Sequence, residues 1–139
     1  MSAPKNQTVL VVDDESVLRR MIHAALEIKG FHVVAACNGV EALEKLSTQH
    51  FDLILTDWNM PGMNGGELIS RVQQQYRNQS PPIIVLSCEA SPEQSKLERM
   101  CIDIWLTKPC RISELQKSVI NTINRDNKSC ELRRKNNLF

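Results

Sequence analysis

The sequence predicts an α/β domain, a three-layer sandwich with five parallel strands in one sheet and five helices on its two faces. Short aliphatic runs rich in Val, Ile and Leu alternate with longer amphipathic stretches, which is typical of repeated βαβ units. The aliphatic runs lack a clean alternation of apolar and polar residues, which indicates strands buried on both faces. Because crossovers between parallel strands are right-handed, the helices are expected to cover both faces of the sheet.

The predicted strands are aliphatic and short. They lie at 8–12, 32–36, 52–56, 82–87 and 103–106. The first helix is expected from about Ser16 to Lys29, with apolar residues on one face and Gly30 as its stop. The second helix is expected at about 40–49.

The remaining helices are placed by their start signals. The third is expected to begin near Gly66. The fourth is expected to open at Ser91 and Pro92, because a serine N-cap followed by proline is a common helix start, with Glu93 in the first turn. The fifth is expected to begin around Ser113.

The length and net charge of the chain limit the classes of function that are possible. The 139 residues suit one domain, and 17 basic against 16 acidic residues leave a net charge of +1. No basic stripe indicates nucleic-acid binding. The longest wholly aliphatic run, 9–12, is too short to span a membrane, and the polar N-terminus lacks a signal peptide, so a cytoplasmic protein without a membrane role is expected. We expect a lead at 1–7, a domain at 8–125 and a polar tail at 126–139, an extension of the last helix.

The cysteines form an odd set without a Cys-x-x-Cys pair. They are Cys37, Cys88, Cys101, Cys110 and Cys130. This spacing argues against both a disulfide framework and a tetrahedral zinc site, and it favours incidental thiols in a reducing compartment.

Polar residues follow the predicted strands at their carboxyl ends, where the functional crevice of an open α/β sheet lies. Asp13 and Asp14 come directly after the first strand, and Asp57 stands at the end of the third. Ser87 ends the fourth strand, and Lys108 follows the fifth. The fold is therefore expected to bring five polar groups from four segments onto one edge.

These residue types together indicate phosphoryl chemistry. Three neighbouring carboxylates repel one another, and a divalent cation such as Mg2+ relieves the repulsion. An ionised Asp57 can act as a nucleophile, and the ammonium group of Lys108 can stabilise a transferring phosphoryl group. Ser87 can donate its hydroxyl to one phosphoryl oxygen.

Each of these residues has an ordinary role when it is considered alone. An aspartate after a strand often forms a turn or caps a helix, a serine there is usually structural, and a lysine is usually a solvated charge. The joint pattern, with one polar group at the end of each successive buried strand, is much harder to obtain by accident.

The chain resembles the receiver family of two-component signalling, in particular its single-domain chemotaxis regulators. The matching segments are 9–16 (VLVVDDES), 52–65 (DLILTDWNMPGMNG), 83–87 (IIVLS) and 105–109 (WLTKP). They anchor the resemblance over about residues 8 to 125. The resemblance implies a flavodoxin-like strand order of 2-1-3-4-5, an order for which such a chemotaxis regulator is itself an established example.

The resemblance also implies a metal site. Asp57 is expected to be the phosphoacceptor and, with Asp14, to bind Mg2+ directly. Asp13 is expected to bind it through water, and the backbone carbonyl of Asn59 to complete the protein ligands.

Three further positions take roles from the family. Ser87 is expected to move toward the phosphoryl group, and Lys108 to pair with that group. The bond between Lys108 and Pro109 is expected to be cis. Trp105 occupies the aromatic switch position, where it would couple the site to the face made by the fourth helix, fifth strand and fifth helix. Simple packing or a partner contact is the alternative for an exposed Trp.

Asn59 and Glu89 are expected to tune the lifetime of the phosphorylated form. They stand two residues after Asp57 and Ser87, where polar groups can orient an attacking water. The same pair appears in fast-dephosphorylating chemotaxis regulators, so a short-lived phosphoform is expected. A phosphorylated protein that persisted for hours at neutral pH with Mg2+ would contradict this.

Three cysteines depart from the family pattern. Cys88 stands where a small alanine is usual, and Cys101 where a glycine accepts a positive φ, so a strained or rearranged turn is expected there. Cys110 replaces a larger apolar residue. These departures bear on the conformational switch rather than on phosphoryl acceptance.

The expected partners are a histidine kinase or histidine phosphotransfer protein and a downstream protein target. The chain would be either a final output or a phosphorelay intermediate. A pseudo-receiver that works without phosphate is disfavoured by the intact site. A haloacid-dehalogenase-type phosphatase needs a second aspartate two residues after the nucleophile, where this chain has Asn59. A flavodoxin-like electron carrier needs a phosphate loop where this chain has acidic residues.

Overall fold

The sheet is five-stranded and entirely parallel. In the computed structural model the backbone is described for residues 7–136 and the side chains for residues 7–126. The strands are β1 (Thr8–Val12), β2 (His32–Ala36), β3 (Leu53–Asp57), β4 (Ile83–Ser87) and β5 (Ile104–Thr107). Their order is β2-β1-β3-β4-β5, which confirms the expected topology.

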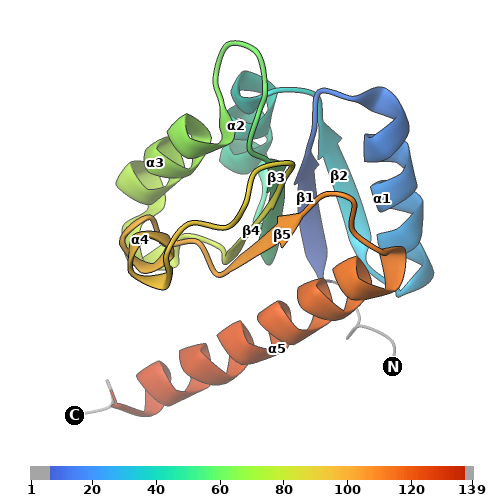
Figure 1. Ribbon diagram of the computed structural model, residues 1–139. Helices are drawn as coiled ribbons and strands as arrows, with labels where there is room; N and C mark the ends of the chain where they lie inside the picture. The colour runs from blue at the N-terminus through green and yellow to red at the C-terminus, as the bar shows by residue number, and fades with distance from the viewer. Residues whose placement is uncertain (1–6, 137–139) are drawn as a thin grey trace.

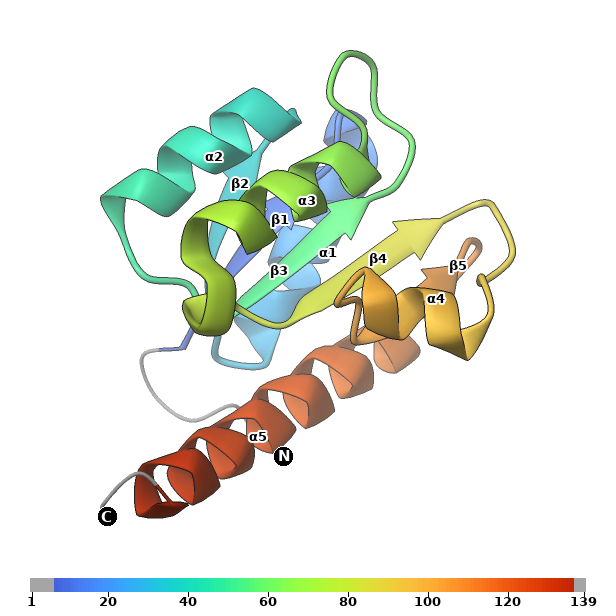
Figure 2. The same ribbon diagram turned by 90° about the vertical axis from the view of Figure 1, so that its left-hand side faces the viewer.

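Helices cover both faces of the sheet, so the molecule has the three predicted layers (Figure 1). They are α1 (Ser16–Ile28), α2 (Gly39–Thr48), α3 (Gly65–Tyr76), α4 (Gln94–Arg99) and α5 (Ile112–Asn136), with a short 3-10 turn at Arg77–Gln79. Figure 2 shows α2, α3 and α4 in front of the sheet, with α1 behind it. The helix α5 lies on the same side as α1, with which it is in contact.

Two apolar clusters explain why the strands lack alternation. In β1, Leu10 and Val12 face the cluster beneath α2 and α3, while Val9 and Val11 face the cluster beneath α1 and α5. All four side chains are at most 1% exposed. Burying such a side chain contributes about 1.5–3 kcal/mol, so both faces of the strand are kept aliphatic.

The observed element bounds differ from the predicted ones by about one residue, except in α4. This helix begins at Gln94 rather than at Ser91 and Pro92. Ser91 donates its hydroxyl to the carbonyl of Pro92 at 3.2 Å, and Glu93, whose φ of −57° and ψ of 148° are not helical, is the N-cap. The serine lies two residues before the observed N-cap, so the predicted start was wrong.

Cys101 has the left-handed backbone expected from the glycine that it replaces. Its φ is +59°, and Arg77 is the other non-glycine residue with positive φ in the described part of the chain. A side chain with a Cβ costs about 1–2 kcal/mol in this region, so the turn before β5 is strained.

The helix α5 continues to Asn136, well into the predicted tail. Its C-terminal part runs past the end of the sheet in Figure 1. Most of the predicted lead and residues 137–139 lie outside the described residues, so the predicted boundaries stay predictions. Among the described residues, no helix has both the length and the apolarity to cross a membrane.

Candidate functional site

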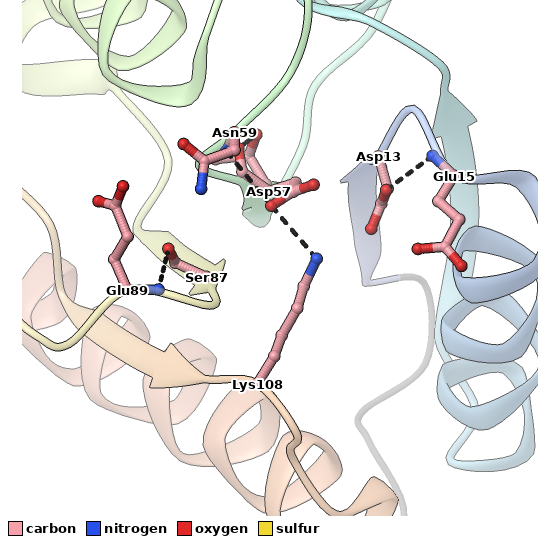
Figure 3. A network of polar contacts seen from close by, with 8 residues as sticks. Asp13, Glu15, Asp57, Asn59, Ser87, Glu89 and Lys108 are labelled. Carbon is pink, nitrogen blue, oxygen red and sulfur yellow. Dashed lines mark hydrogen bonds and ion pairs between the residues drawn. The ribbon is translucent and has the colours of Figure 1, made fainter.

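The polar residues predicted from the sequence meet at the carboxyl edge of the sheet. Asp57 is the last residue of β3 and Ser87 the last of β4, while Asp13 and Lys108 follow β1 and β5 directly. The backbone N–H of Lys108 donates to the carbonyl of Ser87 at 2.7 Å, which brings the lysine back over the edge. Figure 3 shows the side chain of Lys108 pointing toward Asp57, with Asp13 on the other side of the ammonium group.

Three carboxylates form an acidic cluster. Each of Asp13, Asp14 and Asp57 offers an oxygen, and these oxygens all lie within 4.8 Å of one another. Asp13 and Asp57 are only 1% and 7% exposed, whereas Asp14 is open to solvent. The cluster therefore combines two desolvated anions with one accessible anion.

The pKa of Asp13 shows the electrostatic cost of this arrangement. Burial raises the pKa of this carboxyl above its ordinary value, and the charges of Asp57 and Asp14 raise it further. A hydrogen bond from the N–H of Glu15 and the charge of Lys108 lower it, but the net shift is upward. Asp13 therefore holds its proton to a higher pH in the folded protein than an ordinary aspartate does.

One ammonium group partly balances the cluster. The Nζ of Lys108 lies 3.3 Å from Oδ1 of Asp57, and its side chain is 20% exposed. Three ionised carboxylates and one ammonium leave two negative charges, which a divalent cation would neutralise. Because the donor groups are carboxylate oxygens at an edge open to water through Asp14, they fit Mg2+.

Ser87 is fully buried beside this cluster. Its Oγ accepts a hydrogen bond from the backbone N–H of Glu89 at 3.0 Å. A hydroxyl that accepts one bond keeps its own proton as a donor. Ser87 can therefore donate to a phosphoryl oxygen, provided that its side chain turns toward Asp57.

Trp105 lies against the other tryptophan of the chain. Its ring centroid is 5.0 Å from that of Trp58, and its Nε1–H donates to the carbonyl of Glu89 at 3.0 Å. Two hydrogen bonds in series thus join Ser87 to Glu89 and Glu89 to Trp105. The coupling of the site to Trp105 stays a prediction, and these two bonds are the contacts that would carry it.

Asn59 and Glu89 flank Asp57 on the side away from Asp13 (Figure 3). The backbone N–H of Asn59 donates to Oδ1 of Asp57 at a long 3.4 Å, and both flanking side chains are exposed. They lie beside the expected phosphoryl position, within reach of solvent water. Their effect on lifetime stays a prediction.

Gly65 and Gly66, which approach Asp57 and Trp58 closely, were not identified from the sequence. A Cβ on Gly65 would lie 2.5 Å from the carbonyl oxygen of Asp57, and one on Gly66 would lie 2.9 Å from the Trp58 ring. The N–H of Gly65 also donates to the carbonyl of Trp58 at 2.8 Å. The Gly-Gly pair at the start of α3 was a signal for this close approach.

The structure locates the predicted cis bond and the cysteines that depart from the family pattern. The Lys108–Pro109 bond is cis, as predicted. Cys88 and Cys101 are exposed, Cys110 is half-buried, and all four described cysteines are free thiols. The effect of Cys88 on phosphoryl entry stays a prediction.

Comparison with known proteins identifies the class. Residues 9–120 match the family described as the response regulator receiver domain, so the chain belongs to that family, the receiver domains of two-component signalling. The chemotaxis protein CheY of Pseudomonas aeruginosa is 32% identical over 121 residues, which cover 86% of this chain and 98% of that protein. Members of the family are signalling domains rather than conventional enzymes.

A longer protein contains a similar segment. The sensor protein EvgS of Escherichia coli is 34% identical over 117 residues, which cover 84% of this chain and 10% of that protein. The chain thus spans about a tenth of the length of this relative.

Solved structures have the same fold. The chemotaxis response regulator CheY4 of Vibrio cholerae superposes with a TM-score of 0.76 at 35% identity and covers 84% of this chain and 98% of its own. The response regulator TrrA of Thermotoga maritima, solved in complex with Mg2+ and BeF, gives a TM-score of 0.72 at 30% identity, over 84% of this chain and 98% of its own.

Proposed function

We propose that this chain is a single-domain response regulator that accepts a phosphoryl group on Asp57, with the help of Mg2+, from a histidine kinase or a histidine phosphotransfer protein. The observation that carries the proposal is the Lys108 ammonium 3.3 Å from Asp57, within a cluster whose three carboxylates lie within 4.8 Å of one another. This arrangement matches the demands of phosphoryl transfer, which are positioning and cationic groups rather than covalent help. We place such a protein in the cytoplasm.

Asp57 would act as the nucleophile. One of its carboxylate oxygens attacks the phosphorus of a phosphohistidine, a P–O bond forms, the P–N bond breaks, and the electron pair leaves with the imidazole nitrogen. The Nζ of Lys108, already paired with Asp57, can then donate to an oxygen of the bound phosphoryl group.

Asp13, Asp14 and Asp57, with the backbone carbonyl of Asn59, would hold the Mg2+. When bound, the ion would supply the positive charge that neutralises phosphoryl oxygens. Asp14, the exposed member of the cluster, gives water and ligands an open side.

Phosphorylation would switch a partner-binding face. If the Ser87 hydroxyl turns to the phosphoryl group, it gives up its bond with the N–H of Glu89. The β4–α4 loop is then free to move, and with it the carbonyl of Glu89 that holds Trp105. The surface of α4, β5 and α5 around Trp105 would change in consequence.

The outer face of α1 fits the phosphodonor. Val17, Met21 and Ile28 are 63%, 52% and 79% exposed, and with the exposed Ala24 they are spaced four, three and four residues apart. This spacing forms one apolar stripe that another helix can contact. Because the stripe begins three residues after Asp14, a donor helix lying on it reaches the acidic site.

The core test uses acetyl phosphate and Mg2+ followed by intact mass. We expect the wild type and Asp52→Asn, a control at the opposite edge of the sheet, to gain one phosphoryl group. The gain should be lost in Asp57→Asn. If Asp57→Asn were still labelled, or if the wild type gained nothing, the proposal would be wrong.

The apolar stripe on α1, as a docking face for the phosphodonor, has a separate test. We expect Met21→Glu to slow phosphoryl transfer from a phosphorylated histidine kinase by about tenfold, because a buried anion weakens an apolar contact. Labelling by acetyl phosphate should not change, since that donor needs no docking face. The control is Val40→Glu, which alters an equally exposed apolar residue on α2. Equal rates for the two variants would rule out the α1 stripe.

Final output and relay intermediate remain alternative uses of the same Asp57. The phosphorylated chain mixed with a histidine phosphotransfer protein separates them. Transfer of the group to the histidine supports a relay, and retention until hydrolysis supports an output.

A further inference from the structure

The carbonyl oxygen of Asp13 is bound by an arginine. The Nη1 of Arg19 donates to this oxygen at 2.7 Å, a short bond between a charged donor and a backbone acceptor. Asp13 is 1% exposed, and the β1 ladder ends one residue earlier, at Val12. The carbonyl therefore lies just beyond the strand pairing that would otherwise satisfy it, and an unsatisfied buried carbonyl costs about 1–3 kcal/mol.

Three bonds fix Asp13 from three directions. Its N–H donates to the carbonyl of Ala36 at 3.1 Å, and its Oδ1 accepts the N–H of Glu15 at 2.9 Å (Figure 3). The guanidinium of Arg19 binds the remaining polar group of the residue. Together these bonds determine both the course of the β1–α1 turn and the direction of the carboxylate.

The position of Arg19 on α1 explains its reach. It lies in the first turn of the helix, where its N–H donates to the carbonyl of Glu15 at 3.0 Å. Side chains of an α-helix lean toward the N-terminus, so the guanidinium returns over the turn that precedes the helix. The rigid fork of the guanidinium suits a fixed acceptor better than a lysine would.

The hydrogen bond of Arg19 at the acidic cluster goes to a backbone carbonyl and not to a carboxylate. Lys108 is the cation that lowers the pKa of Asp13. The guanidinium of Arg19 contributes to lowering the pKa of Glu41, after the larger effect of the hydrogen bonds with Cys37. Arg19 therefore holds the cluster through the backbone of Asp13.

We propose that Arg19 is a positioning residue for the Mg2+ site, which sets the affinity for the ion by holding the Asp13 turn. The inference rests on the proposed function, since it needs the acidic cluster to bind Mg2+. Residues that orient metal ligands in this way typically change metal affinity by 10–100-fold when they are replaced.

The test is calorimetric titration of the full chain with Mg2+. We expect Arg19→Met, which keeps the apolar stem but removes the donors, to weaken binding by about tenfold. The matched control is Arg20→Met, which removes the same charge from the exposed neighbour and should stay within about twofold. Equal affinity of Arg19→Met and wild type, or equal losses in the two variants, would overturn the inference.

A double-mutant cycle shows whether Arg19 acts through Asp13. In the Asp13→Asn background, Arg19→Met should lose much less affinity than in the wild type, because the oriented carboxylate is already gone. Full additivity of the two losses would overturn the positioning role. If Arg19→Met does not fold, Arg19→Lys against Arg20→Lys serves as the pair, with a loss of about threefold expected only for the first.

Failure of this inference is distinct from failure of the proposed function. A wild-type chain that binds Mg2+ and gains a phosphoryl group, while Arg19→Met binds Mg2+ equally well, retains its function without a role for Arg19. If the wild-type chain binds no Mg2+, both the proposed function and the role of Arg19 are ruled out.

Discussion

Aspartates serve opposite purposes at the two edges of the sheet. At the amino edge, Oδ2 of Asp52 accepts the N–H of Thr8 at 2.8 Å, and Oδ2 of Asp103 accepts the N–H of Ile83 at 2.7 Å. Each carboxylate thus satisfies the first N–H of a neighbouring strand. At the carboxyl edge, three aspartates crowd one another with Lys108 as the paired cation.

The pKa direction alone does not distinguish the two edges. Burial raises the pKa of both Asp13 and Asp103. The neighbouring charges differ, because Asp13 faces the anions Asp57 and Asp14, whereas the charge of Arg125 lowers the pKa of Asp103. Both carboxylates accept a backbone N–H, so it is the neighbouring charges that separate them: a buried carboxylate beside other carboxylates indicates a site for a cation, and one beside an arginine indicates a structural role.

The largest expected effect is on phosphoryl transfer. We expect Lys108→Met to lower the rate of labelling by acetyl phosphate by about a hundredfold at saturating Mg2+, because one donor to the developing charge is lost. Asp103→Ala, at the other edge, should leave this rate within a few-fold of wild type. Labelling kinetics by intact mass measure both, and a normal rate for Lys108→Met would remove it from the site.

Stability should change in opposite directions at the two edges. Asp103→Ala leaves the N–H of Ile83 without its acceptor and should lower the free energy of unfolding by about 1–2 kcal/mol. Asp13→Asn keeps an acceptor for the N–H of Glu15 but removes a buried charge, and it should raise the free energy of unfolding by about 1 kcal/mol without Mg2+. Urea unfolding measures both, and a destabilised Asp13→Asn would contradict the account of the cluster.

The smallest expected effect is on how the stability gained by Asp13→Asn depends on pH. Because the pKa of Asp13 is raised by folding, the folded chain binds this proton more tightly than the unfolded chain does. The contribution of Asp13 to stability is therefore present at low pH and lost as pH rises from the ordinary aspartate pKa through the raised one. The advantage of Asp13→Asn should grow over the same interval, and a constant difference would contradict the shift.

Much of the site was predictable, because strand ends and catalytic residue types are local in the sequence. Asp57, Ser87 and Lys108 each follow a recognisable aliphatic run, and parallel strands bring such ends together. The contacts of Trp58 with Trp105 were not predictable, since they join residues 47 positions apart through ring packing. The late start of α4 follows from the non-helical backbone of Glu93, which has ψ of 148° and which the serine-proline signal did not indicate.

The sequence by itself determined the fold class, the strand positions and the types of chemical group at the carboxyl edge, because hydrophobic period and turn residues act over a few neighbours. Only the tertiary structure decided how those groups are held. The Arg19 bond to the Asp13 carbonyl and the exposure of the α1 stripe depend on side-chain direction and on which helix faces remain uncovered. Both lie within one stretch of the sequence, but they follow from how the sheet and α5 pack against α1, which residue types and spacing alone do not specify.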